Sequence, residues 1–265
     1  MQILRAAGLP VIGDAFPEHW PQEFRIANPG GFFESRLTAG VYHATNPCPE
    51  SGAFLSPTAT RTHAVKVFVP GLVRSDLAYL DRVIVTVRAW REVASSHQTM
   101  AAMHPRLPAL DLCPALLWWS ETFAAIRDIA IRGYPAHVVA YSRLLGNPAS
   151  EVTDVLDWLG IGGLDVDAAA ACIRPELRRS RPTRDVDVSL SPRQIEVLDE
   201  LYEHLEHAVP MTVAFISKLN ALDAEVTPTL RAAQSAFDAQ TRRQSQHAHT
   251  DTFRTHPSRS TTSTV

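Results

Sequence analysis

The segment of this 265-residue chain that most limits its fold is the run RVIVTVR at residues 82–88. Its central residues are apolar and mostly β-branched, which is typical of a strand buried on both faces in a parallel sheet. A helical pattern follows directly, over about residues 89–103. Parallel strands need a crossover connection, which is usually a helix, so this strand–helix pair predicts an α/β fold.

The same alternation continues along the rest of the chain. Short apolar runs predict further strands over residues 9–12, 64–69 and 136–140. Helical spacing and capping signals predict helices over residues 1–7, 114–131, 150–159, 167–173 and 212–222, and another that opens with the capping box at Ser191. The predicted fold class is therefore α/β, a parallel sheet flanked by helices.

We expect two parts, an α/β domain over residues 1–222 and a helical extension with a disordered tail over 223–265. Beyond about residue 244 the chain has almost no apolar residues, so it cannot bury a core. Residues 15–57 are rich in Pro, Gly and Asn and predict an irregular segment, whose aromatic residues indicate a packed loop. Loops of this length are usually functional.

Composition excludes several classes of protein. The formal net charge of −3 argues against a generally basic nucleic-acid binder. Three cysteines without paired spacing give neither a zinc motif nor a disulfide framework. No apolar run approaches the about 20 residues of a membrane span, and Arg5 interrupts the short apolar stretch at the N-terminus, unlike a signal peptide. We therefore expect a cytoplasmic enzyme or binding protein, with its oligomeric state left open.

Arg88 and Ser96 are the first candidate binding residues. Arg88 closes the strand at 82–87, and Ser96 lies in the helix that follows. In open α/β sheets ligands bind at the carboxyl ends of the strands, where an arginine and free helix N–H groups can hold a phosphate. The alternative is that Arg88 pairs with a neighbouring carboxylate and that Ser96 faces solvent.

An arginine at this place, with a serine eight residues later, resembles the 3′-phosphate motif of the sulfotransferases that use 3′-phosphoadenosine 5′-phosphosulfate (PAPS). The resemblance implies a fold of the P-loop NTPase type, PAPS as cosubstrate, and Arg88 and Ser96 as ligands of its 3′-phosphate. The family's Asn-Pro or Asp-Pro after the arginine is replaced here by Ala89-Trp90.

Lys66 is the candidate that matches the family's catalytic lysine. The run HAVKVFVP at 63–70 resembles the family's Lys-Thr-His-x-Pro strand end, so the resemblance implies that Lys66 stabilises the bridging oxygen during transfer. The alternative is a strand lysine that extends to the sheet edge. Phe68 stands where many members have a catalytic histidine. We expect Lys66 and Arg88 at the same end of neighbouring parallel strands, lining one crevice.

The proton acceptor must then be another residue. The run NPGGFFE at 28–34 resembles a segment of bacterial sulfotransferases, and Glu34 is the first candidate for the general base. Asp14 is the second, and a loop carboxylate that caps a turn is the alternative for Glu34. The run PELRRSR at 175–181 resembles the family's late cofactor loop, in which either Arg178 or Arg179 reaches the 3′-phosphate.

One family element has no counterpart in the chain. No glycine-rich Lys/Arg-Ser/Thr loop for the phosphosulfate occurs, and residues 1–11 resemble the helix that follows this loop in bacterial relatives. We therefore expect a chain that begins after the N-terminal strand and loop.

Two functions remain open. One is sulfuryl transfer to a hydroxyl or amine acceptor, a small molecule, glycan or lipid whose pocket residues 15–57 would shape. The other is an inactive nucleotide-binding or scaffold homologue. A P-loop kinase is disfavoured because no Asp-rich magnesium site is evident, and we expect no metal.

Overall fold

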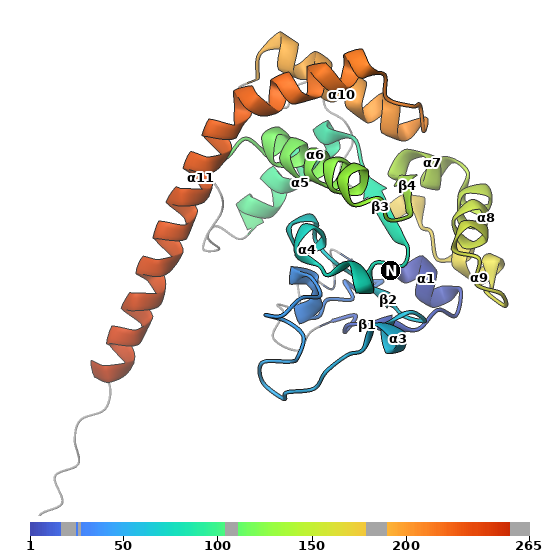
Figure 1. Ribbon diagram of the computed structural model, residues 1–265, viewed down its shortest axis with the longest axis horizontal. Helices are drawn as coiled ribbons and strands as arrows, with labels where there is room; N and C mark the ends of the chain where they lie inside the picture. The colour runs from blue at the N-terminus through green and yellow to red at the C-terminus, as the bar shows by residue number, and fades with distance from the viewer. Residues whose placement is uncertain (17–24, 26–27, 104–110, 179–189, 255–265) are drawn as a thin grey trace, which may run out of the picture.

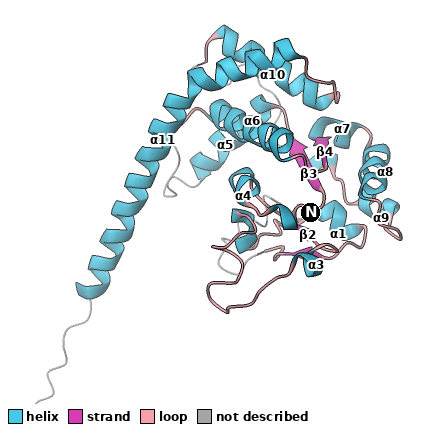
Figure 2. Ribbon diagram, viewed as in Figure 1, coloured by secondary structure: helices cyan, strands magenta, loops and turns pink. Residues whose placement is uncertain are grey.

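The computed structural model describes residues 1–16, 25, 28–103, 111–178 and 190–254; for 100–103 and 244–254 it describes the backbone alone. The chain forms a mixed α/β structure with two small parallel sheets flanked by helices (Figures 1 and 2). The expectation of parallel strands covered by helices is confirmed.

Each sheet consists of two strands. β1 (Val11–Ile12) pairs with β2 (Ala64–Val65), and β3 (Val83–Val87) pairs with β4 (Ala136–Ala140) over five residues. Within the described part of the chain β2 and β3 do not pair, so the prediction of one sheet is wrong. Figure 1 shows the N-terminus between the two sheets.

The helices between β3 and β4 make the crossover that parallel pairing requires. They are α5 (Trp90–Met103) and α6 (Pro114–Arg132), close to their predicted bounds. α6 ends because Gly133 adopts a left-handed conformation with φ of 67°, which glycine accepts without strain. The remaining helices and 3₁₀ turns are α1 (Gln2–Ala6), η1 (Arg36–Ala39), α3 (Pro57–Thr60), α4 (Val69–Arg74), η2 (Leu77–Tyr79), α7 (Tyr141–Gly146), α8 (Pro148–Leu159), α9 (Val166–Ala171), η3 (Pro175–Leu177), α10 (Pro192–Glu206) and α11 (Val213–Arg254).

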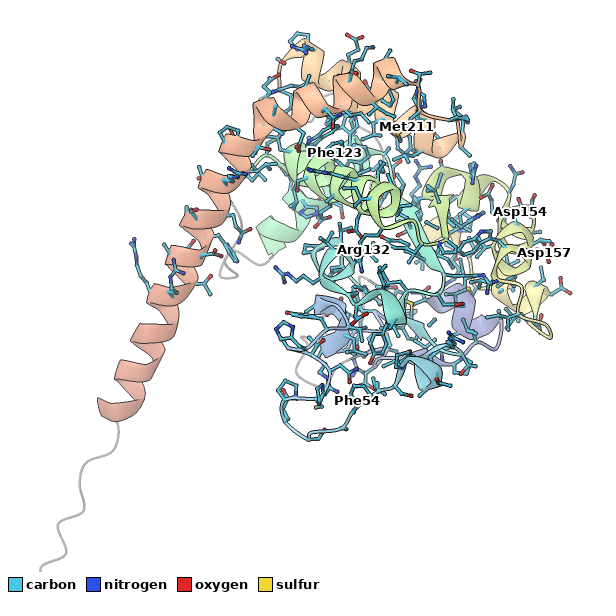
Figure 3. All side chains as sticks on the ribbon, viewed as in Figure 1. Phe54, Phe123, Arg132, Asp154, Asp157 and Met211 are labelled. Atoms are coloured by element: carbon cyan, nitrogen blue, oxygen red, sulfur yellow. The ribbon has the colours of Figure 1, made fainter. Side chains whose placement is uncertain are left out.

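The larger hydrophobic core lies where α5, α6, α10 and α11 pack on β3. Its fully buried side chains include Trp119, Leu198, Leu201 and Phe215. Phe123 and Met211, labelled in Figure 3, belong to the same packing region. A second core joins α1, α8 and α9 to β4. Burial of these apolar faces fixes the position of the strand ends that carry the polar residues considered below.

The structure corrects two predicted elements. The strand predicted over 64–69 stops at Val65, because Pro70 favours the first turn of α4, which begins at Val69. The helix predicted over 212–222 continues as α11 to Arg254 and passes through the expected domain boundary at residue 222. The tail expected to be disordered from about residue 244 is therefore helical as far as Arg254, since no glycine or proline follows Pro228 in α11.

None of the described helices is long and apolar enough to cross a membrane. In Figure 1 the C-terminal half of α11 extends away from the two cores.

Candidate functional site

The first polar centre lies at the carboxyl ends of β3 and β4. Val87 and Ala140 are the last pair of the β3–β4 register, so Arg88 and Tyr141 follow them side by side. The Arg88 guanidinium carbon lies 4.7 Å from the centroid of the Tyr141 ring, a cation–π contact. The strand pairing therefore places an arginine and an aromatic ring together at the edge where ligands of α/β proteins bind.

Glu92 is the carboxylate of this centre. It lies in the first turn of α5, and its side chain is only 4% exposed. Arg88 donates from Nε to Glu92 Oε2 over 2.7 Å. Arg178, which follows η3, donates from Nη2 to the other oxygen, Glu92 Oε1. This hydrogen bond raises the pKa of the Arg178 guanidinium above its ordinary value. One buried carboxylate thus connects two arginines that lie 90 positions apart in the sequence.

The alternative considered for Arg88, a neighbouring carboxylate, therefore describes a contact that is present. The centre therefore holds two guanidinium groups around one buried carboxylate. Of the two arginines that the sequence left open, Arg178 joins this centre, while Arg179 lies outside the described residues.

Ser96 lies one helical turn beyond Glu92 on α5. Residues four apart share a helix face, so the half-buried Ser96 hydroxyl is on the same face as the Glu92 carboxylate. The role of Ser96 as a ligand of a bound phosphate stays a prediction.

Trp90 fixes the position of the start of α5. Its indole is 2% exposed and donates from Nε1 to Asp199 Oδ1 of α10 over 2.7 Å. Arg91 pairs with the same carboxylate. The Ala89-Trp90 sequence thus ties the start of α5, and with it Glu92, to α10.

The second polar centre lies at the carboxyl ends of β1 and β2. Lys66 follows β2 directly and donates from Nζ to Glu34 Oε1 over 2.7 Å. The Lys66 and Glu34 side chains are 26% and 20% exposed. The Lys66 ammonium also lies 5.8 Å and 5.1 Å from the ring centroids of Phe32 and Phe68. The Phe68 ring therefore contacts the lysine without offering a base.

Asp14 and Glu34 are brought together by a backbone bridge. Asp14 N donates to Glu34 O, and Glu34 N donates to Asp14 O, each over 3.1 Å. Gly13 makes this approach possible: its φ is 128°, and a Cβ there would lie 2.7 Å from the carbonyl oxygen of Phe33. Three residues predicted for catalysis, Asp14, Glu34 and Lys66, thus meet at one place.

The two centres belong to different sheets. Lys66 and Arg88 each follow the last residue of their strand, but β2 and β3 are not paired, so the expectation of neighbouring strands is not met. The α-amino group of Met1 lies near the second centre: burial lowers its pKa, and the charge of Lys66 lowers it further against an opposing effect of Cys172.

α10 contributes polar groups beside the first centre, which no sequence pattern predicted. Ser142, next to Tyr141, contacts Glu206 and lies 3.1 Å from the hydroxyl of Tyr202. No local signal relates Ser142 to residues 60 or more positions away. In the part of the chain that the structure describes, no group of three or more His, Cys, Asp or Glu could hold a metal ion.

No protein-family model, curated protein or solved structure matches this chain. The function proposed below therefore rests on the residues and on their arrangement.

Proposed function

We propose that this protein binds PAPS and transfers its sulfuryl group to a hydroxyl or amine acceptor. The observation that carries the proposal is the convergence of Arg88 and Arg178 at the carboxyl ends of β3 and β4. Two guanidinium groups suit the charge of a phosphate monoester and its three oxygens. Ser96, on the adjacent turn of α5, supplies a hydroxyl donor of the kind that such sites use.

The residues divide between holding the nucleotide and assisting transfer. Arg88, Arg178 and Ser96 would bind the 3′-phosphate. Lys66 would stabilise the negative charge that develops on the bridging oxygen, since a cation near a leaving phosphate lowers the energy of the transition state. Glu34 would accept the acceptor's proton, because its carboxylate already accepts a hydrogen bond within that centre.

In the transfer step, the acceptor oxygen or nitrogen forms a bond to sulfur while the bond from sulfur to the bridging oxygen breaks. The bridging oxygen keeps the electron pair and leaves as part of adenosine 3′,5′-bisphosphate. The acceptor proton passes to Glu34, with Asp14, on the adjoining backbone, as the second candidate. In-line transfer of this kind depends mainly on positioning and charge stabilisation.

The second candidate function is nucleotide binding without transfer. It requires the two arginines of the first centre and none of the residues of the second. Both functions require the nucleotide site at Arg88.

Calorimetry with adenosine 3′,5′-bisphosphate tests that shared site. We expect wild-type protein to bind, and Arg88→Ala to lose about 1.5–3 kcal/mol of binding free energy, because a charge-assisted hydrogen bond is removed. Ser96→Ala should lose less. Arg231→Ala, an exposed arginine on α11, is the control and should bind as wild type does. Equal binding by wild type and Arg88→Ala would contradict the assignment.

A further inference from the structure

Glu92 has an unusual place among the charged residues of the first centre. Its carboxylate is almost fully buried, and each of its oxygens accepts a hydrogen bond from a different arginine. A buried carboxylate is costly unless it is paired and hydrogen-bonded, so Glu92 depends on Arg88 and Arg178 for its stability. The two arginines come from separate parts of the chain and are joined through this carboxylate.

The polar groups around Glu92 are not fully hydrogen-bonded. Nε of Arg178 is buried and has no hydrogen-bond partner in the described part of the chain. Tyr141 lies against Arg88, and Tyr202 of α10 contacts Ser142, the residue after Tyr141. Burial raises the pKa of Tyr202, and the charges of Glu206 and Glu92 raise it further against the hydrogen bond with Ser142.

We infer that Glu92 is an internal counterion that takes the pairing position of the ligand's phosphate group, and that phosphate binding displaces it from the arginines. The inference rests on the proposed nucleotide site. Without ligand, Glu92 keeps the two guanidinium groups together. A phosphate group, with a charge of about −1.5 to −2 and three acceptor oxygens, can pair with both arginines more fully than a single carboxylate can.

This arrangement makes ligand selection depend on charge. An anion that binds the two arginines must replace Glu92. A singly charged anion therefore gains little binding free energy, whereas a phosphate monoester gains more because it carries a larger negative charge. Glu92 is thus a specificity-determining residue that acts through Arg88 and Arg178. It requires no contact of its own with the ligand.

The test compares Glu92→Gln with wild type in calorimetric titrations of adenosine 3′,5′-bisphosphate. Glutamine keeps the shape of the side chain and removes the competing charge. We expect the variant to bind the bisphosphate at least about tenfold more tightly, since a charge a few ångströms away is removed from a partly buried site. Adenosine 5′-phosphate, which lacks the 3′-phosphate, should bind both proteins equally.

Asp128→Asn is the matched control. Asp128 is likewise a buried carboxylate, and it pairs with Arg132 four residues later on the same helix. Arg132, labelled in Figure 3, also donates to the backbone carbonyl groups of Leu72 in α4 and of Ser75 directly after α4. Neutralisation of Asp128 should leave nucleotide affinity unchanged. A gain in affinity with this variant would show that any lost negative charge has the same effect, which would overturn the inference.

Glu92→Asp keeps the inference testable if the glutamine variant does not fold. Aspartate retains the charge but withdraws it from the arginines, so we expect a smaller gain in bisphosphate affinity. Weaker binding by either variant would mean that Glu92 orients the arginines for the ligand, which overturns the inference while the proposed function stands. Absence of bisphosphate binding in wild type and all variants would instead overturn the proposed function.

Discussion

At the scale of single residues, the Lys66–Glu34 pair is the contact on which catalysis would depend. The 2.7 Å hydrogen bond holds the lysine beside the carboxylate until a leaving group arrives. Such partly exposed pairs contribute only about 1 kcal/mol or less to the free energy of unfolding, so the fold depends little on this pair. Its position directly after β2 places both charges at a strand end.

Glu34→Gln should abolish sulfuryl transfer while leaving nucleotide binding intact. The substitution keeps the side-chain shape and the hydrogen bond from Lys66, but it removes the proton acceptor. The measurement is release of adenosine 3′,5′-bisphosphate from PAPS in the presence of acceptor alcohols, beside a binding titration. Glu50→Gln, an exposed carboxylate of the same loop region, is the control and should not change either value. Turnover near that of wild type in Glu34→Gln would move the role to Asp14.

The residues of the second centre could be found from the sequence because each stands in a short local motif. Lys66 is tied to a strand end and Glu34 to a glycine-rich run, and the fold brings both together with Asp14. The proposed role of Glu92 could not be predicted from a local motif. Its contact with Arg88 is local, but its contact with Arg178 spans 86 positions and depends on the packing of η3.

At the scale of elements, strands and helices with a strong local pattern were predicted closely. β3 and β4 are mostly apolar runs, and α6 carries a proline at its start and a glycine at its end. β2 was predicted too long, because residues 64–69 are apolar apart from Lys66 and continue so into the first residue of α4.

α11 continues without a break past residue 222, the expected end of the α/β domain. Its apolar side chains continue past that point at helical spacing, and Val226 is 3% exposed within the larger core. The helix therefore belongs to the packed domain for at least one more turn than the sequence suggested. The polar composition of the residues that follow gave no sign of this.

Val226→Ala tests this continuation of the domain. We expect a loss of about 1.5–3 kcal/mol in the free energy of unfolding, because two buried methyl groups are removed and a small cavity remains. Val213→Ala makes the same change on the same helix at a side chain that is 82% exposed, and it should change stability by less than about 0.5 kcal/mol. Urea unfolding of the three proteins measures both. A neutral Val226→Ala would mean that the core ends before residue 226.

At the scale of the whole molecule, the two sheets divide the chemistry. Arg88 follows β3 and is joined through Glu92 to Arg178, and Lys66 follows β2 and pairs with Glu34, so the residues proposed for the 3′-phosphate and for transfer lie at different sheets. Local sequence patterns predicted parallel strands but not their division into two sheets, since the pairing of β2 and β3 is a long-range property. For transfer, one nucleotide has to reach both centres.

The most direct test of this account is a crystal structure of the protein with adenosine 3′,5′-bisphosphate. The account predicts the 3′-phosphate within hydrogen-bond distance of Arg88 and Arg178, with Glu92 withdrawn from at least one of them, and the 5′-phosphate directed towards Lys66. A nucleotide bound at another surface, with the contacts of Glu92 to both arginines unchanged, would contradict it.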